Sequence, residues 1–269
     1  MAAGDDEGLF GGMMGRLDND RTRSLLGRAE ELRTRCFRIV AIGSVVFGLA
    51  MWFDQQIFAW LKVPLEFALP KAKAVLFFTG PLDVFMSYIR VGFMTAALIT
   101  GPWALWEIWS WVRPAIPEWD GAFFTRLFVA SVILLFGGVA LCYYGILPMT
   151  MQVLLGMAEG VATPTITVGD YISLTTIMML GFGLVFQLPI IVLVAERLGI
   201  VRLEDLIRFR GPVLVVILVI AAIATPTPDP FSQLAMATPM YLMYEIAILI
   251  IRRRRRGEAK ALVTTSSSS

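Results

Sequence analysis

The chain alternates between long apolar stretches that carry no charge and short segments rich in charged residues, proline or glycine. A helix needs about 20 apolar residues to cross the hydrocarbon core of a bilayer. Six stretches reach or approach that length with their flanks, so the pattern predicts an all-α membrane protein with six transmembrane helices. The predicted spans are 39–53, 91–109, 122–145, 172–195, 213–227 and 234–251.

The segments between the spans refine this prediction. Residues 54–90 contain Pro64, Pro70 and a Gly-Pro turn, and we expect an external loop with short helices there. Residues 127–158 carry no charge and are too long for one span, so Pro148 is predicted to separate the third span from an apolar helix outside the bilayer. The prolines and the short fifth and sixth spans favour a curved, concave bundle.

Three regions follow from this division. Residues 1–35 are polar and lack the apolar core of a cleavable signal peptide. Residues 36–251 form the predicted six-helix transmembrane domain. Residues 252–269 begin with five arginines and end in a Thr/Ser run, so we expect a disordered tail whose arginines anchor the topology and contact anionic lipid.

The basic residues are distributed unequally between the two sides of the predicted bundle. Of the 23 Lys and Arg residues, 19 fall in the N-terminal segment, around residues 110–126, in the loop 196–212 and in the tail. The other side carries Lys62, Lys71, Lys73 and Arg90. Because cytoplasmic segments carry the excess of Lys and Arg, both termini are predicted to face the cytoplasm.

The composition excludes several classes of protein. The chain is 57% hydrophobic and 16% charged, with a mean hydropathy of +0.74, whereas soluble domains are about 45–50% apolar and about 25% charged. It has no histidine, and its two cysteines lie near opposite ends of different apolar segments. We therefore expect no enzymatic activity, no metal site, no disulfide and no nucleic-acid partner.

Polar side chains inside a span are costly and mark candidate sites. Three fall within the predicted spans: Glu107, Gln187 and Glu245. Both glutamates lie near span ends, where an internal pair is the simpler interpretation, and Glu107 lies among four tryptophans typical of an interfacial belt. Gln187 precedes Pro189 and either bonds backbone freed by the proline or docks a partner helix; the sequence favours neither. Three scattered polar residues and no internal repeat argue against the alternative of a six-span solute transporter.

Carboxylates outside the spans form a second group of candidates. Glu30 and Glu31 precede the first span, and Glu118 and Asp120 lie in the loop before the third. Each one alone is simply interpreted as a solvated charge beside abundant arginines. Two carboxylates at separated points also suit a partner that carries arginines, because each can accept a bidentate, charge-assisted fork from a guanidinium.

Five short motifs follow one another along residues 25–251. They are Arg-Ala-Glu-Glu-Leu-Arg at 28–33, Pro-Leu-Asp-Val-Phe at 81–85, Phe-Gly-Leu-Val-Phe-Gln-Leu-Pro at 182–189, Thr-Pro followed by Asp229, Ser232 and Gln233, and Pro-Met with Tyr-Glu at 239–245. In this order they resemble the motifs of the twin-arginine translocase subunit TatC family.

The resemblance implies a receptor and translocase core. Members of this family bind signal peptides bearing two consecutive arginines and export the folded cargo across the bacterial cytoplasmic membrane, using the proton-motive force and no cofactor. By resemblance, Glu31 and Asp120 would bind the signal peptide, with Arg33 and Glu118 beside them.

The resemblance also implies partners in the membrane. By resemblance, the mid-span Gln187, with Phe186 and Pro189, would contact the single-span proteins TatA and TatB, and the receptor would associate with further copies of itself. The residues expected to shape the external turns are Pro64, Asp229, Ser232 and Gln233.

Three departures from the family pattern leave an alternative open. The family's histidine becomes Arg28, its loop glutamate is shortened to Asp120, and its glutamine in the second span becomes Glu107. Glu118 lies two residues before Asp120 and is the other candidate for the loop carboxylate. The chain is therefore expected to be either a full receptor or a diverged paralogue with altered cargo.

Overall fold

The structure, a computed structural model, describes residues 5–68, 76–77, 80–115, 121–156, 166–224 and 230–266, with side chains, a few positions excepted, from residue 27 to residue 257. Its elements are α1 (Asp5–Trp52), α2 (Asp54–Ala68), β1 (Leu76–Phe77), α3 (Pro81–Val112), the 3-10 turn η1 (Arg113–Ala115), α4 (Gly121–Leu141), the π turn η2 (Cys142–Ile146), α5 (Leu147–Gly156), β2 (Ile166–Thr167), α6 (Val168–Val185), α7 (Leu188–Arg197), α8 (Leu203–Arg208), α9 (Arg210–Ala224) and α10 (Pro230–Ser266).

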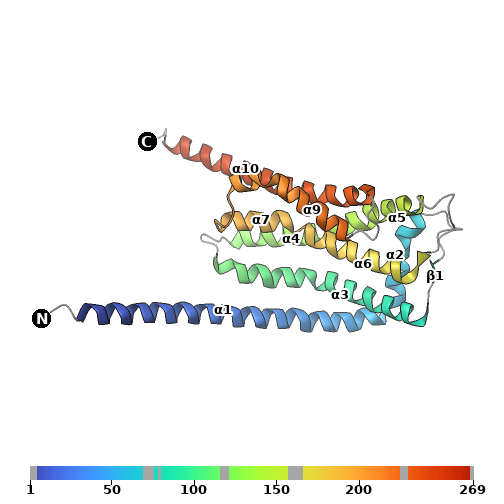
Figure 1. Ribbon diagram of the computed structural model, residues 1–269, viewed down its shortest axis with the longest axis horizontal. Coiled ribbons are helices and arrows are strands. Elements are labelled where there is room, and N and C mark those ends of the chain that lie inside the picture. Colours follow the sequence, from blue (N-terminus) through green and yellow to red (C-terminus); the bar gives the residue numbers. More distant parts are fainter. Residues whose placement is uncertain are drawn as a thin grey trace.

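The long helices run side by side along one direction (Figure 1). α1 packs against α3, α3 against α6, α4 against α6, and α10 against both α7 and α9. The short elements α2, α5 and β1 gather at one end of the bundle, where β1 pairs in parallel with β2. The first turns of α1 and the last turns of α10 lie at the opposite end, at left in Figure 1, so the chain begins and ends on the same side.

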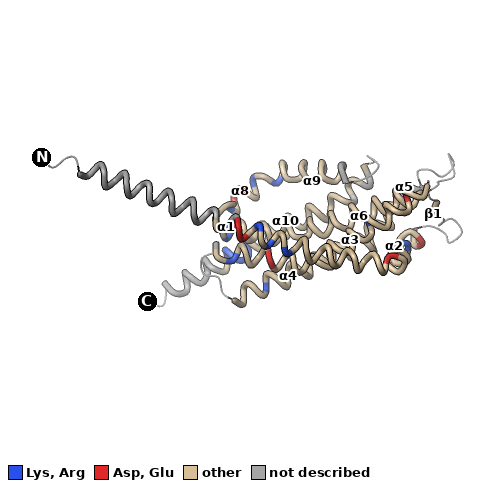
Figure 2. Tube along the Cα trace, turned by 90° about the horizontal axis from the view of Figure 1, so that it is seen from below, with Lys and Arg blue, Asp and Glu red and all other residues tan. Residues whose placement is uncertain are grey.

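Apolar helices dominate the bundle, as an integral membrane protein requires. Four stretches of the described residues are long and apolar enough to span a bilayer: Glu30–Trp52, Pro81–Val112, Gly121–Leu154 and Val168–Arg197. Arg210–Ala222 is apolar but shorter. Charged residues lie mostly near the two ends, and the tube between them is nearly free of charge (Figure 2). The all-α membrane class is thus confirmed, while the count of six spans stays a prediction.

The helices extend beyond two of the predicted span boundaries. α3 begins at Pro81, well before residue 91, because a proline at the first helical position has its φ already set for a helix. An apolar helix, α5, does follow the predicted end of the third span at residue 145, but no break at Pro148 separates the two, since α4 continues through η2 into α5. In η2 the Leu147 N–H donates to the Cys142 carbonyl five residues back, and this wider turn accommodates Pro148, which has no N–H.

The fourth predicted span is broken into two helices. α6 ends at Val185 and α7 begins at Leu188, with Phe186 and Gln187 forming a turn between them. Pro189 stands in the first turn of α7, where a helix has no use for its N–H. The break therefore falls where the proline allows a new helix to start.

The tail predicted to be disordered is helical in the structure. α10 continues without interruption to Ser266. Arg, Glu, Ala, Lys and Leu between residues 252 and 262 are strong helix formers, and they extend a helix that has already been nucleated. The predicted boundary between residues 35 and 36 likewise falls inside α1.

Pro64 lies inside α2 and is buried, which corrects its predicted place in a turn. A proline has no N–H to offer the carbonyl four residues earlier, here that of Trp60. The Tyr143 hydroxyl donates to this carbonyl at 2.6 Å, and the Tyr171 hydroxyl donates to the carbonyl of Leu61 at 2.6 Å. Tyr143 thus supplies the donor that Pro64 lacks, and Tyr171 adds a second hydrogen bond from the bundle to α2.

Candidate functional site

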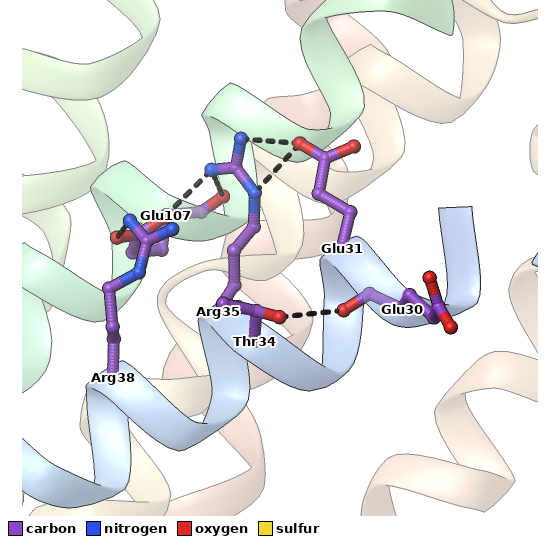
Figure 3. A network of polar contacts seen from close by, with 6 residues as sticks. All are labelled: Glu30, Glu31, Thr34, Arg35, Arg38 and Glu107. Carbon is purple, nitrogen blue, oxygen red and sulfur yellow. Dashed lines mark hydrogen bonds and ion pairs between the residues drawn. The ribbon is translucent and has the colours of Figure 1, made fainter. Parts of the chain in front are cut away.

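An ionic network joins α1 to α3 (Figure 3). Arg35 lies between two carboxylates: its Nη2 is 2.7 Å from Glu31 Oε1, and its Nη1 is 2.7 Å from Glu107 Oε2. Arg38 Nη1 lies 3.2 Å from the other oxygen of Glu107. The network therefore runs from the exposed Glu31 through Arg35 to Glu107 and Arg38.

Burial differs sharply along this network. The side chain of Glu107 is 5% exposed, whereas that of Glu31 is 49% exposed. A buried carboxylate without a partner is strongly destabilising, so the two arginines stabilise Glu107 within the bundle. The prediction of an internal pair for Glu107 is confirmed, and its partners come from α1.

Glu31 retains capacity for a further ligand. Both bonds from Arg35, through Nε at 3.1 Å and Nη2 at 2.7 Å, fall on the same oxygen, Oε1. No second partner for this carboxylate is found in the described part of the chain, which leaves Oε2 open. Because an ionised carboxylate accepts at about four lone-pair sites, Glu31 can take another guanidinium.

The neighbours of Glu31 differ in their roles. Glu30 is exposed, and its backbone carbonyl accepts from the Thr34 hydroxyl at 2.9 Å. Arg33 is exposed on the same helix. Glu118 and Asp120 lie outside the described residues, directly before α4, so their role as a second carboxylate remains a prediction.

Gln187 is buried at the break between α6 and α7. Its side-chain Nε2 donates to the carbonyl of Ser131 on α4 at 3.0 Å, and its Oε1 is buried without a partner among the described residues. The hydroxyl of Ser131 in turn accepts from the indole N–H of Trp109 at 2.9 Å. The glutamine therefore bonds across to a neighbouring helix, not to the local backbone freed by Pro189, and Trp109 is a buried residue outside any interfacial belt.

Glu245 is also paired within the protein, at a partly exposed position between α10 and α9. Its Oε2 accepts from Arg210 on α9 at 2.6 Å, and its Oε1 accepts from the Tyr241 hydroxyl at 3.0 Å. The predicted internal pair is confirmed, but its partner comes from α9 and not from the arginine run of the tail.

Two arginines of the run 252–256 form salt bridges within the protein. Arg254 and Arg255 lie 3.4 Å and 3.0 Å from the nearly buried carboxylate of Glu196, and Arg255 also lies 3.4 Å from Glu204. The run therefore fastens α10 to α7 and α8 in addition to any contact with lipid.

The remaining predicted residues lie away from this network. Gln233 donates from Nε2 to the carbonyl of Leu218 at 2.9 Å, which joins α10 to α9. Asp229 lies outside the described residues, and the side chain of Ser232 is not described. No group of three His, Cys, Asp or Glu side chains suited to a metal ion occurs in the ranges that the structure describes.

Comparison with known proteins agrees with this architecture. The family model described as Sec-independent protein translocase protein (TatC) matches residues 29–239. The TatC proteins of Carboxydothermus hydrogenoformans and Magnetococcus marinus are 29% and 32% identical to the chain, covering 87% and 88% of it and 94% and 86% of their own lengths. The TatC protein of Escherichia coli (strain K12) is 29% identical, covering 86% of this chain and 89% of its own.

Solved structures agree as well. The crystal structure of a twin-arginine translocase receptor, TatC, matches with a TM-score of 0.75 at 29% sequence identity, covering 82% of this chain and 96% of that one. A second structure of the receptor, in DDM, matches with a TM-score of 0.76 and covers 83% of this chain. With a family match over most of its length, the chain belongs to the TatC family of Sec-independent protein translocase proteins.

Proposed function

We propose that this chain is the signal-peptide receptor and core subunit of a twin-arginine translocase, which exports folded proteins across the bacterial cytoplasmic membrane using the proton-motive force. The observation that carries the proposal is the Glu31 carboxylate. It is half-exposed, positioned by an arginine that is itself anchored to a buried glutamate, and open at one oxygen. A guanidinium of the signal peptide is the chemical group that such a carboxylate recognises best.

The proposed orientation places both termini in the cytoplasm, with six spans of which α9 and the apolar part of α10 are the short fifth and sixth. Two observations support it. The first turns of α1 and the last turns of α10 lie at the same end of the bundle. That end carries Glu31 and, in the proposed topology, 19 of the 23 basic residues.

The test is the affinity of the purified protein for a twin-arginine signal peptide against the same peptide with two lysines. The two peptides carry the same charge, so only the planar fork of arginine distinguishes them. We expect tighter binding of the arginine peptide. Equal binding would overturn the receptor proposal and favour the diverged paralogue with altered cargo.

Binding at Glu31 has to proceed in the presence of Arg35. Arg35 is an internal guanidinium that already occupies one oxygen of Glu31, so an incoming arginine competes with it. Glu107 offers Arg35 a second carboxylate, to which it can remain bonded when the ligand takes Glu31. We propose that this sharing keeps Glu31 available to a ligand.

Replacing Glu107 with glutamine is therefore expected to weaken binding of the twin-arginine peptide. The change removes a negative charge next to Arg35 and Arg38 and leaves Arg35 with Glu31 alone. One charge pair of this kind is worth about 1 kcal/mol, so we expect a loss of roughly fivefold in affinity. The matched control is Glu245→Gln, which removes a paired glutamate elsewhere. An unchanged or higher affinity for Glu107→Gln would contradict the sharing of Arg35.

The proposed membrane partners are single-span proteins of the TatA and TatB type, together with further copies of this chain. The supporting feature is the break between α6 and α7, where the buried Gln187 Oε1 lacks a partner among the described residues. A buried oxygen without a hydrogen bond is costly, and a polar side chain on a partner helix would satisfy it after a local shift at the break between α6 and α7 exposes it.

Gln187→Leu is expected to reduce cross-linking of a TatA- or TatB-type helix to α7 by several-fold, because leucine offers no acceptor. Site-specific photo-cross-linking from residues of α7 in membranes measures this directly. Gln233→Leu serves as the control, since it removes an amide of the same kind that bonds α9. If both variants cross-link as the unmodified protein does, the docking role of Gln187 is wrong.

A further inference from the structure

An apolar groove runs between α4, α7 and α10 with arginines at one end. Its volume is about 660 Å³, within the range of about 300–1,000 Å³ typical of small-molecule sites. Apart from three arginines its lining is apolar, for example Leu127, Ile133 and Ile246. The three arginines are Arg126, Arg197 and Arg254, one from each helix.

The three arginines meet at the same end of the groove. The guanidinium of Arg197 lies over the ring of Phe123, 3.6 Å from its centroid, and Phe123 is one helical turn before Arg126. Arg254 contacts Glu196, the residue next to Arg197. Arg126 is exposed and has no ion pair or hydrogen bond among the residues that the structure describes.

Counted over the described residues, the local charge is positive. Arg255 adjoins the cluster through Glu196, so among the side chains that the structure describes four arginines lie with two carboxylates, Glu196 and Glu204. The nearly buried Glu196 is already shared by two of the arginines. The end of the groove thus remains attractive to an anion.

The groove has the length of one membrane leaflet. On α4 its lining extends from Arg126 to Gly137, and on α10 from Met243 to Arg254. At 1.5 Å per residue each stretch is about 16 Å long, roughly half of the ~30 Å hydrocarbon core. A molecule with one anionic head and tails of leaflet length fits both the charge and the apolar walls.

We propose that this groove binds an anionic glycerophospholipid, with its phosphate at Arg126, Arg197 and Arg254 and an acyl tail along α4 and α10. Basic pockets between transmembrane helices at the cytoplasmic side are the setting in which anionic headgroups bind. The inner end of the groove reaches Phe186 and Pro189, beside Gln187. A partner helix docked at Gln187 would displace the tail there, so the lipid occupies the protein without its partner.

The test is native mass spectrometry of the purified full-length protein, titrated with phosphatidylglycerol or with phosphatidylcholine of the same acyl chains. We expect one phosphatidylglycerol to be retained with at least tenfold preference. Arg126→Gln should reduce its affinity about fivefold, the effect of one basic residue near an anionic headgroup. Arg253→Gln is the matched control, because Arg253 is exposed on α10 and does not line the groove.

A second variant tests the apolar part of the site without changing charge. Gly137 lines the groove, and a Cβ at this position would meet no atom within 4 Å, so the side chain of Gly137→Leu starts without a clash and takes up space in the groove. We expect it to release both lipids equally. Equal binding of the two lipids to the unmodified protein would overturn the proposal, as would equal losses in Arg126→Gln and Arg253→Gln, or full retention in Gly137→Leu.

Discussion

Replacing Glu31 with glutamine is expected to lower the affinity for a twin-arginine signal peptide by between about 10-fold and 100-fold. A hydrogen bond to a charged group contributes about 1.5–3 kcal/mol, and each 1.4 kcal/mol is a factor of ten in the dissociation constant. Glutamine keeps the size of the side chain but replaces one acceptor oxygen with a donor and removes the charge. Arg35 would stay anchored by Glu107, so the fold of α1 on α3 should survive.

The control for this experiment is the adjacent residue. Glu30 is exposed, and only its backbone carbonyl makes a described hydrogen bond, so Glu30→Gln should bind the peptide as the unmodified protein does. Both variants should insert into membranes to the same extent. Unchanged peptide affinity in Glu31→Gln, with normal insertion, would show that the signal peptide is recognised elsewhere.

Gly138→Ala is expected to lower stability markedly, although it adds only one methyl group. A Cβ at this position would lie 2.7 Å from Cγ of Phe186 and 2.8 Å from the backbone oxygen of Phe182. The Phe182 oxygen cannot move without shifting α6, and rotation of the Phe186 ring moves neither its Cγ nor its Cβ, which would lie 2.9 Å away. Overpacking of this kind costs about 1–3 kcal/mol, which corresponds to a fall of roughly 2–10 °C in Tm for a chain of this size.

The neighbouring glycine provides a matched control for that change. Gly137 is also in α4, but a Cβ there would meet nothing within 4 Å. Alanine favours a helix over glycine by about 1 kcal/mol, so Gly137→Ala should leave Tm unchanged or raise it. Thermal unfolding in the same detergent compares the two variants. Equal Tm values would mean that α4 and α6 are not in the close contact described.

The sequence was sufficient for the class of fold because membrane insertion depends on composition summed over about 20 residues. The stretch that forms α6 and α7 has too little charge to be anything but a span. Boundaries were less certain, since they depend on single residues such as Pro81 and Pro148. A proline starts the helix in one place and is absorbed by a π turn in the other, and the identity of the residue alone does not distinguish these outcomes.

Contacts of the site could be predicted only between residues that lie close together in the sequence. Glu31 and Arg35 are four residues apart on one helix, a spacing at which opposite charges meet. Arg35 and Glu107 are 72 residues apart, and Arg210 and Glu245 are 35 apart. Which of the many arginines reaches which glutamate depends on how the helices pack, so neither partner could be read from the sequence.

The attachment of α2 to the bundle constrains the order in which amino-acid substitutions can accumulate in this region during evolution. Pro64 and Tyr143 form a pair in which the proline leaves the Trp60 carbonyl without its helical donor and the Tyr143 hydroxyl supplies one. Any residue other than proline at position 64 would restore the backbone N–H that bonds the Trp60 carbonyl and make the Tyr143 hydroxyl redundant. Substitution of Tyr143 by phenylalanine would then be tolerated. If proline then returned at position 64, the Trp60 carbonyl would have no donor and the attachment of α2 would be weakened. The order in which these substitutions arise therefore determines which of them can be reversed.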